Sequence, residues 1–415
     1  MAADTAPPAH APVATVTGLL SGIAGTGTDK IRGGYTRPVY STAELDLRSW
    51  FIEQAEKRGL AVDTDRNGAI WAWWDVPGGD RSNSLVTGSH LDSVPGGGPF
   101  DGPLGVASAL VAVDILKTRM TTPTRPLAVV VFPEEEGSRF GVACLGSRLM
   151  TGAIDPDKAR NLQDPDGSTF ADVARANGLD PRFLGRDHKL LGQIGAFVEL
   201  HVEQGRGLID LDQPIAIASS ILGHGRWRLS IDGQGNHAGT TLMADRRDPM
   251  VSAARTVVAI RDIARKQDHA RATVGRLQPV PGGTNVIASR VDFWLDVRHP
   301  DDAVTAALVQ GIHGQARIIA AEEGCSVELR EESLSPTVHF DPGLQKELQL
   351  ALPRAPVLDT GAGHDAGVLA PYLPTAMVFV RNPSGVSHSP EEHVMDEDAE
   401  TGARTLADAL HRLMA

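Results

Sequence analysis

LVTGSHLDSVPGGGPFDGPLG, residues 85–105, begins as an apolar run, breaks into polar residues and continues through a glycine-rich turn. The apolar part is typical of a strand that is buried on both faces, and a long apolar segment that favours a helix follows the turn. His90 and Asp92 stand where the strand would end, and Asp101 follows the turn. Open α/β sheets bind their ligands at the carboxyl ends of strands. An imidazole and two carboxylates at this place indicate the start of a metal site.

The length and charge of the chain narrow the kind of protein that could carry such a site. With 415 residues it exceeds what one hydrophobic core normally serves, so two domains are expected. The formal net charge of -13 argues against a nucleic-acid or anionic-membrane surface, where basic residues supply the affinity. A small-molecule partner is therefore favoured.

Neither the cysteines nor the N-terminal segment indicates secretion or a membrane. Cys144 and Cys325 are the only cysteines and form no CxxC motif, so neither a disulfide framework nor a thiolate zinc site is indicated. Residues 1 to about 13 lack the basic and apolar regions of a signal peptide and are expected to form a mobile leader rich in proline and alanine. No apolar run approaches the ~20 residues of a membrane span. We expect a cytoplasmic protein.

The first part of the chain alternates helix and strand signals. A helix is predicted from Ser41 to Gly59, and a hairpin with its turn at Asn67–Gly68 follows it. Three continuous apolar runs come next: SLVTGSH, PLAVVVFPEEEG and GAFVELHVEQG. Uninterrupted runs of this type are typical of a mainly parallel sheet that is covered on both faces in an α/β domain.

The pattern changes after Gln213. Strands are predicted at 227–233, 272–280, 291–299 and 325–330, and helices at 248–267 and 301–324. Their order is β-α-β-β-α-β, the ferredoxin-like pattern, and apolar runs of the first type return afterwards. We therefore predict an α/β catalytic domain formed by residues 1–213 and 331–415, interrupted by a smaller inserted domain at 214–330.

Histidines and glutamates follow several of the apolar runs. Any one of the 14 histidines would ordinarily be a surface or hydrogen-bonded residue, but His90, His201 and His388 each stand at the end of such a run. Glu134–Glu136 follow the run VVVFP in the same way, and their mutual repulsion calls for a nearby cation. Imidazole and carboxylate ligands without thiolate suit zinc, manganese, cobalt or nickel, and a shared aspartate suggests two ions.

Two metal ions in one site point to hydrolysis. Ions about 3.5–4 Å apart can polarise a carbonyl group and activate one water molecule between them. A carboxylate that binds neither ion would act as general base on that water and later as general acid toward the leaving nitrogen. These residues therefore indicate metal-assisted hydrolysis of a C–N bond.

The motifs, taken together, resemble one known family. They are, in chain order, GSHLDSVPGGGPFDG, EEEGSRF, ELHVEQG, NHAGTT, TNVIASRVDFWLDVR, GAGHDA and GVSHSP. This set is similar to the M20-type amidohydrolases of the hydantoinase/carbamoylase group, which includes N-carbamoyl-L-amino-acid hydrolase, allantoate amidohydrolase, ureidoglycolate amidohydrolase and β-ureidopropionase. The resemblance covers nearly the whole chain. The sequence differs from the usual family pattern at Leu242, where the family usually has proline, and at Thr360, where serine is commoner.

The resemblance implies the ligands of two divalent metal ions. His90 and His201 would bind one ion, Glu136 and His388 would bind the other, and Asp101 would bridge the two.

It also implies the groups that surround these ligands. Glu135 would be the general base, and Asp92 would orient the imidazole of His90 through its other nitrogen. The alternative for Asp92 is a turn-capping role. His201 argues against the peptidase and aminoacylase branches of the superfamily, which usually have a carboxylate at that position.

Substrate contacts and a homodimer are further implications of the resemblance. The inserted domain would be a lid and a dimer interface, with His237 stabilising the oxyanion in the partner's site. Asn285 and Arg298 would bind the substrate carboxylate, Arg298 by a planar two-point contact. Solvent exposure of His237 and a surface ion pair of Arg298 with Asp301 or Asp302 are the alternatives. Residues of the catalytic domain would complete the pocket: Gln204, Gly361, Ala362, Gly363 and His364.

The predicted reaction is hydrolysis of the ureido C–N bond of an N-carbamoyl-L-α-amino acid, which yields the amino acid, carbon dioxide and ammonia. GGTN, residues 282–285, resembles the carbamoylase form more than the allantoate form. Allantoate amidohydrolase, and then ureidoglycolate amidohydrolase or β-ureidopropionase, remain as alternatives. An M20 aminoacylase or dipeptidase is less favoured because of His201. A relative that only binds ligands is least favoured, because none of the expected ligands is missing.

Overall fold

The computed structural model describes residues 13–120 and 122–414, in two compact units. The first unit consists of Met1–Ser219 and His339–Ala415, and the second of Ser220–Val338. The inserted unit thus starts and ends several residues later than the expected boundaries at 214 and 330. Apart from Val13, the expected leader lies outside the described residues.

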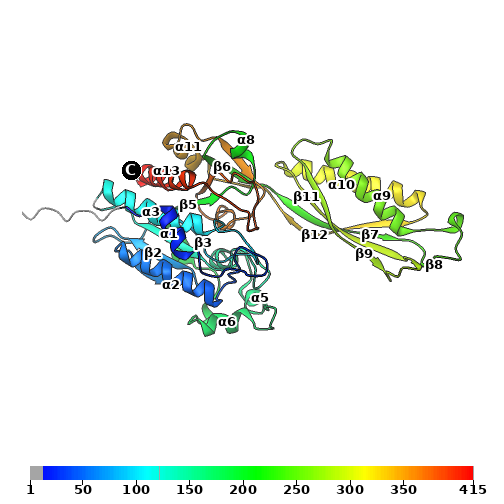
Figure 1. Cartoon of the computed structure of the whole chain (residues 1–415), viewed down its shortest axis with the longest axis horizontal. Coiled ribbons are helices and arrows are strands. Elements are labelled where there is room, and N and C mark those ends of the chain that lie inside the picture. The colour runs from blue at the N-terminus through cyan, green and yellow to red at the C-terminus, as the bar shows by residue number, and fades with distance from the viewer. Residues whose placement is uncertain (1–12, 121, 415) are drawn as a thin grey trace, which may run out of the picture. The chain divides into compact units, whose positions relative to one another are not determined.

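A nine-stranded mixed sheet forms the first unit (Figure 1). Its central strands are parallel and lie in the order β4 (Leu127–Phe132), β3 (Ser84–His90), β5 (Ile194–Val202) and β15 (Thr375–Val380). Nearly all of their residues are buried. Burial on both faces explains why these strands read as unbroken apolar runs in the sequence.

Other strands extend this sheet on both sides. β1 (Ala61–Thr64) and β2 (Ile70–Trp74) form the predicted hairpin, and β2 pairs antiparallel with β4. On the other side β6 (Ile215–Ile221) pairs antiparallel with β15. β13 (Val338–His339) and β14 (Val357–Thr360) both pair with β6. The segment after residue 214, expected in the inserted domain, therefore begins as a strand of the first sheet.

Helices cover this sheet. The N-cap of α2 (Thr42–Lys57) is Ser41, whose side chain accepts the N–H of Glu44. α3 (Pro103–Arg119) and α13 (Asp396–Met414) contribute to one large apolar core with the central strands. The remaining helices of this unit are α1 (Val16–Ile23), α4 (Leu145–Thr151), α5 (Pro156–Arg160), α6 (Phe170–Ala176), α7 (His188–Gln193), α8 (Gly207–Asp210), α11 (Pro342–Ala351), α12 (Asp365–Leu369) and the 3-10 helix Pro181–Phe183. Among residues 13–120 and 122–414, no helix is both long and apolar enough to cross a membrane.

The second unit is a four-stranded antiparallel sheet with two long helices (Figure 1). Along the chain its main elements are β7 (His224–Asp232), α9 (Pro249–Ala264), β9 (Arg271–Val280), β11 (Arg290–Arg298), α10 (Asp302–Glu322) and β12 (Ser326–Ser335). In space the strands lie in the order β12-β7-β11-β9. A separate pair is formed by β8 (Asn236–His237) and β10 (Val286–Ile287), and a 3-10 helix spans Met243–Asp245. The last strand was predicted at 325–330, but β12 extends to Ser335. The prediction ended too early because the second half of the strand is exposed and shows no apolar pattern.

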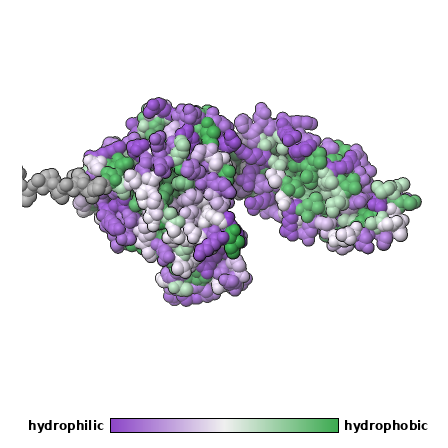
Figure 2. All heavy atoms as spheres, viewed as in Figure 1, coloured by the Kyte–Doolittle hydropathy of each residue, from purple (hydrophilic) through white to green (hydrophobic). Residues whose placement is uncertain are grey.

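Hydrophobic residues gather on one face of the second unit, over α9 and α10 (Figure 2). Val251 and Val258 on α9 and Ile318 on α10 are exposed by 40%, 50% and 56% of their surface. Contiguous exposed apolar residues are typical of a surface that contacts another protein. This face is therefore a candidate contact surface of the second unit.

Gly105 marks a very close contact between α3 and the sheet. A β-carbon at this position would lie 2.3 Å from the carbonyl oxygen of Leu200 and 2.9 Å from Cβ of Ser89. Alanine favours a helix by about 1 kcal/mol over glycine, but overpacking against backbone costs roughly 1–3 kcal/mol. The nearest atom belongs to the backbone and cannot move aside, so the cost lies in the upper part of that range. We therefore expect Gly105→Ala to lower the free energy of unfolding by about 1–2 kcal/mol, measured by urea denaturation.

Gly311 in α10 provides the matched control. It is exposed, and a β-carbon there would meet no atom within 4 Å. Gly311→Ala should therefore stabilise the protein by up to about 1 kcal/mol. A Gly105→Ala protein that is as stable as the parent would contradict the close packing of α3 on the sheet.

Candidate metal centre

The carboxyl ends of the parallel strands bring the predicted ligands together. His90 is the last residue of β3, His201 is the second-last residue of β5, and Glu136 follows the end of β4 by four residues. The strand register aligns these ends, because His90 pairs with Phe132 and His201 pairs with Phe379. Ligands that are far apart in the sequence therefore meet at one edge of the sheet.

Two groups of ligand atoms share Asp101. Its Oδ1 lies 3.3 Å from Nε2 of His90 and 3.3 Å from Nε2 of His201. Its Oδ2 lies 3.4 Å from Nε2 of His388, which in turn is 3.4 Å from Oε2 of Glu136. The ligand atoms of each group lie within 4.8 Å of one another, so one ion could contact all three. One oxygen of Asp101 faces each group, as expected of a bridging carboxylate.

The two buried histidines fit a metal ion. Their Nδ1 atoms lie 3.0 and 2.9 Å from the backbone carbonyl oxygens of Asp92 and Val202, respectively. A carbonyl only accepts hydrogen bonds, so Nδ1 of each neutral ring carries the proton and the Nε2 lone pair faces Asp101. Within the described residues, Nε2 of His90 and of His201 is buried and has no hydrogen-bond partner. A divalent cation would satisfy lone pairs that otherwise face a carboxylate.

The pKa values around the centre report a concentration of negative charge. Burial raises the pKa of Glu136 to about 8, and Asp101 adds to this shift. Burial also raises the pKa of Glu135, with a further contribution from Asp365. Burial alone would lower the pKa of His90, yet Glu135 and Asp101 outweigh it and raise the value. All three pKa values are thus raised, and the neighbouring carboxylates contribute to each shift. A bound cation would neutralise this negative charge.

Glu135, the predicted base, lies between His90 and Cys144. Its Oε2 is 3.6 Å from Nε2 of His90, and its Oε1 accepts a hydrogen bond from the Cys144 thiol at 3.3 Å. The backbone N–H of Cys144 donates to the carbonyl oxygen of Glu135 at 2.7 Å. Burial and Glu135 raise the pKa of the thiol, so it keeps its proton and can donate. Sequence patterns indicated no such role, because a lone cysteine carries no motif.

Asp92 contacts His90 through its backbone, and its carboxylate lies slightly farther from the same ring nitrogen. Nδ1 of His90 is 3.0 Å from the backbone oxygen of Asp92 and 3.6 Å from its Oδ1. The carboxylate of Asp92 accepts the N–H of Glu135 at 3.2 Å and of Glu136 at 3.1 Å. The side chain of Asp92 thus fixes the backbone that carries the predicted base and one predicted ligand.

Gln204 and His364 lie beside the predicted ligands. Nε2 of Gln204 donates to Oδ2 of Asp101 and to Oγ of Ser387, at 2.8 Å in each case. The ring of His364 lies 4.4 Å from that of His201, measured between centroids. Burial and His201 lower the pKa of His364, so its ring is neutral. Two of the predicted substrate contacts are therefore brought to the centre.

The loop Gly361–Gly363 precedes His364 and joins β14 to α12. Its shape is supported by the backbone N–H of Ala362, which donates to Oγ1 of Thr360 at 3.1 Å. A β-carbon at Gly363 would meet no atom within 4 Å, so the backbone there is open to close approach.

The other predicted contacts belong to the second unit, and they lie at its opposite ends. His237 and Asn285 are neighbours, because β8 pairs with β10 and the N–H of Ala238 donates to the carbonyl oxygen of Asn285. Arg298 is the last residue of β11, whose first residue, Arg290, follows β10 after two residues. An extended strand of this length spans about 27 Å. The structure therefore brings His237 and Asn285 together and separates both from Arg298.

His237 and Arg298 are each held by a local contact. Nδ1 of His237, which is exposed, accepts the N–H of Gly239 at 3.1 Å, so the neutral ring carries its proton on Nε2. Arg298 pairs with Asp296 through Nε–Oδ1 and Nη2–Oδ2 distances of 2.8 and 3.2 Å. An ion pair of Arg298 thus forms with an aspartate of its own strand.

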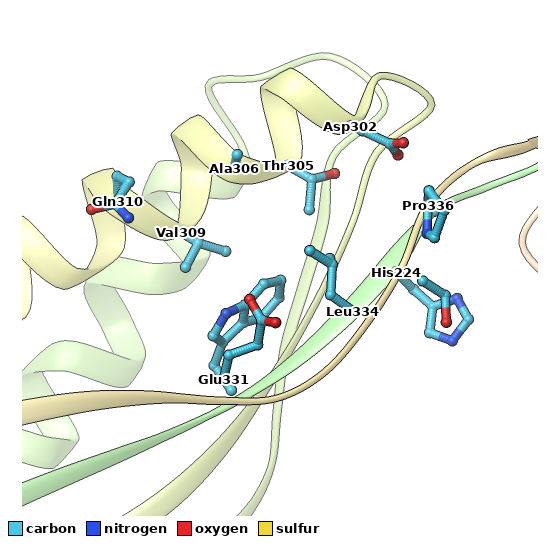
Figure 3. A pocket seen from close by; sticks show the side chains of 12 residues that line it. His224, Asp302, Thr305, Ala306, Val309, Gln310, Glu331, Leu334 and Pro336 are labelled. Atoms are coloured by element: carbon cyan, nitrogen blue, oxygen red, sulfur yellow. The ribbon is translucent and has the colours of Figure 1, made fainter.

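A cavity of about 410 Å³ also lies within the second unit (Figure 3). Its walls come from β7, α10 and β12, with apolar surface from Trp227, Val309 and Leu334 and polar groups from His224 and Asp302. None of its lining residues is a predicted site residue. The candidate centre is therefore defined by its ligand groups in the first unit and not by this cavity.

The chain matches known hydrolases along almost its whole length. Residues 86–412 match the model of the family described as Peptidase family M20/M25/M40. The chain is 37% identical to an N-carbamoyl-L-amino acid amidohydrolase of Geobacillus stearothermophilus, over 92% of this chain and 94% of that protein. It is 34% identical to an allantoate amidohydrolase of Escherichia coli (strain K12), over 92% of this chain and 93% of that protein.

Solved structures give the same picture. A hydantoinase/carbamoylase family amidase from Burkholderia multivorans is 32% identical, covers 96% of this chain and 97% of its own, and has a TM-score of 0.85. The chain therefore belongs to peptidase family M20/M25/M40 and, within it, to the amidohydrolases of the hydantoinase/carbamoylase group.

Proposed function

We propose that this amidohydrolase cleaves the ureido C–N bond of N-carbamoyl-L-α-amino acids and releases the amino acid, carbon dioxide and ammonia. The observation that carries the proposal is the position of Asp101, whose two oxygens face separate groups of ligand atoms. A relative that is 37% identical is named for this reaction.

Hydrolysis of allantoate is the second candidate. The relative named allantoate amidohydrolase is 34% identical over the same share of the chain. Both substrates combine a carboxylate with a neighbouring ureido group, so one set of contacts could bind the part that they share. Ureidoglycolate and N-carbamoyl-β-alanine contain the same two groups and complete the set of candidates.

The two ligand groups would each hold one divalent ion. His90, His201 and Oδ1 of Asp101 would form one site, and Glu136, His388 and Oδ2 of Asp101 would form the other. Imidazole and carboxylate ligands suit zinc, manganese, cobalt and nickel. When bound, the ions would polarise the ureido carbonyl and lower the pKa of the attacking water.

Glu135 would transfer the protons of the reaction. Its Oε1 accepts a hydrogen bond from the Cys144 thiol, whereas its Oε2 faces His90. This arrangement directs Oε2 toward the centre. We infer that Glu135 accepts the proton of the attacking water and delivers it to the leaving nitrogen. General acid–base catalysis of this kind contributes about 10²–10⁴-fold to the rate.

The second unit would bind the substrate carboxylate and stabilise the oxyanion. Arg298, oriented by Asp296, would bind the carboxylate through two parallel hydrogen bonds, together with Asn285. His237 would donate from Nε2 to the oxygen that becomes negative when water adds to the ureido carbonyl. The strand order β12-β7-β11-β9 supports a ferredoxin-like lid domain for this role.

The separation of these residues supports a homodimer. Arg298 stands at one end of β11, and His237 and Asn285 lie next to the other end, about 27 Å away. A ureido acid is far shorter than this distance. A substrate that contacts both ends therefore needs residues from two copies of the chain. In the proposed dimer, His237 and Asn285 act in the partner's site. The exposed apolar residues of α9 and α10 offer a surface for the contact.

A panel of substrates tests the proposed reaction. Chelated protein reloaded with Mn²⁺ is assayed for ammonia and amine release from N-carbamoyl-L-amino acids, their D-enantiomers, allantoate, ureidoglycolate, N-carbamoyl-β-alanine and N-acetyl amino acids. We expect the highest kcat/KM with an N-carbamoyl-L-amino acid and no release from N-acetyl compounds. The highest kcat/KM with allantoate would select the second candidate, and no ammonia from any ureido compound would rule out both.

Metal removal should make stability depend on pH. Burial is the first cause that raises the pKa of Glu134 and Glu136 to about 8 and that of Glu392 to about 7. Between their ordinary pKa and these values the folded state binds more protons than the unfolded chain, so stability falls as pH rises. The thermal midpoint of chelated protein should therefore fall between about pH 5 and about pH 8.

Reloading with Zn²⁺ is the control for this pH dependence. An ion at about 100 times its Kd stabilises the folded state by about 2.7 kcal/mol, and deprotonated carboxylates bind it better. Zn²⁺ should therefore raise the thermal midpoint more at about pH 8 than at about pH 5. An equal effect at both pH values would contradict carboxylate ligands with raised pKa values.

Mixed dimers test whether His237 acts across the interface. Glu135→Gln and His237→Ala are each expected to lower kcat by about 10²-fold or more while the metal stays bound. If His237 serves the partner, a dimer with one subunit of each kind contains one intact site. Equal mixing should then restore about a quarter of the parental activity, because half of the dimers are mixed. No recovery after verified subunit exchange would show that His237 does not act in the partner's site.

A further inference from the structure

We propose that Glu392 is a positioning residue that fixes the backbone of Asp101, and that Gly98 provides the space that Glu392 needs. Glu392 is only 3% exposed. Its Oε1 accepts the backbone N–H of Phe100 at 3.0 Å and that of Asp101 at 2.9 Å. One carboxylate oxygen thereby holds two successive residues of the loop. This role rests on the metal-binding part of the proposed function.

The contact connects two distant parts of the chain. Glu392 lies 291 residues after Asp101 and four residues after His388, which is a predicted ligand of the second ion. The next residue, His393, meets the ring of Phe100 edge to face, at 6.1 Å between centroids and an angle of 83°. Two neighbouring residues of the C-terminal segment thus hold two neighbouring residues of the loop, and His388 and Asp101 are kept close as a result.

The position of Asp101 must be well defined, because its two carboxylate oxygens face two separate groups of ligand atoms. A rotation of the backbone at this residue would move both oxygens, and metal–ligand distances in well-formed sites stay within about 0.2 Å of their typical values. Gln204 and Ser387 contact the side chain at Oδ2, at 2.8 and 3.5 Å. The contact with Glu392 is made to the backbone instead. Side chain and backbone of Asp101 are therefore held by different groups, and Ser387 links them, because its Oγ also lies 3.5 Å from Oε2 of Glu392.

Gly98 explains why the loop can accept this carboxylate. A β-carbon at Gly98 would lie 2.4 Å from both Cβ and Oε1 of Glu392. Gly96, with a φ of +76°, serves the turn itself, whereas Gly98 does not have a positive φ. The requirement for glycine at position 98 is therefore one of space, and the space is filled by Glu392.

A double-mutant cycle on metal affinity tests this role. Chelated protein is titrated with Zn²⁺ alone against a competing chelator, so no substrate is involved. Glu392→Ala should weaken Zn²⁺ binding by about 10–100-fold, as is typical when a group that holds a metal ligand is removed. Glu392→Gln keeps an oxygen for the two N–H groups and should weaken binding by less than about threefold.

Gly98→Ala completes the cycle. As a single change, Gly98→Ala should weaken Zn²⁺ binding, as Glu392→Ala does, because the added β-carbon would displace the carboxylate of Glu392. Alanine at position 392 would still place its Cβ 2.4 Å from the β-carbon added at position 98, so the second background of the cycle is Glu392→Gly, which lacks both Cβ and the carboxylate. In that background the same change should have little further effect. A purely structural role for Glu392 would lower the thermal midpoint without this pattern in Zn²⁺ affinity.

Glu391 is the matched control, because it is the adjacent glutamate and is exposed. Glu391→Ala should leave the Zn²⁺ affinity unchanged. Parental affinity in Glu392→Ala would overturn the proposal. If that variant does not fold, parental affinity in Gly98→Ala would overturn it instead. A parent protein that binds no Zn²⁺ would reject the metal centre itself, whereas bound Zn²⁺ without an effect of either variant would reject only the role of Glu392.

Discussion

The carboxylate of Asp101 is the point on which the rest of the site depends. Its oxygens face the Nε2 atoms of His90, His201 and His388. Acceptors that point at one another inside a protein repel unless a proton or a cation lies between them. Parallel strands bring these groups to one edge of the sheet, and the surrounding residues then either offer a ligand atom or hold one in place. Buried acidic groups that would otherwise destabilise the fold become the means of binding a cation.

The fold was predictable where a segment has one uniform environment. β3, β4 and β5 are buried on both faces, so their apolar runs are unbroken. The boundaries of the second unit were harder to predict. β6 lies just after the expected boundary but pairs with β15, a strand that comes more than 150 residues later in the chain. Local composition contains no information on such pairing. The second half of β12 is exposed, so alternation fails there.

The candidate ligands were predictable because each follows an apolar run, whereas the residues that hold them were not. Cys144 contacts Glu135 from nine residues away, and Glu392 contacts Asp101 from 291 residues away. Both contacts depend on how the chain folds and not on any spacing within it. Asp92 was expected near His90, but the contact is made by a backbone carbonyl, which every residue possesses. A single sequence therefore indicates ligand types better than the atoms that orient them.

The position of β15 has a consequence for biosynthesis. This strand lies between β5 and β6, yet it leaves the ribosome only after the whole second unit has been made. Until then one edge of β5 is unpaired, and an unpaired apolar strand is prone to associate with other chains. His388 and Glu392 are translated later still. The nascent chain thus carries an unfinished sheet for most of its synthesis, and the centre around Asp101 is among the last parts of the molecule to be completed.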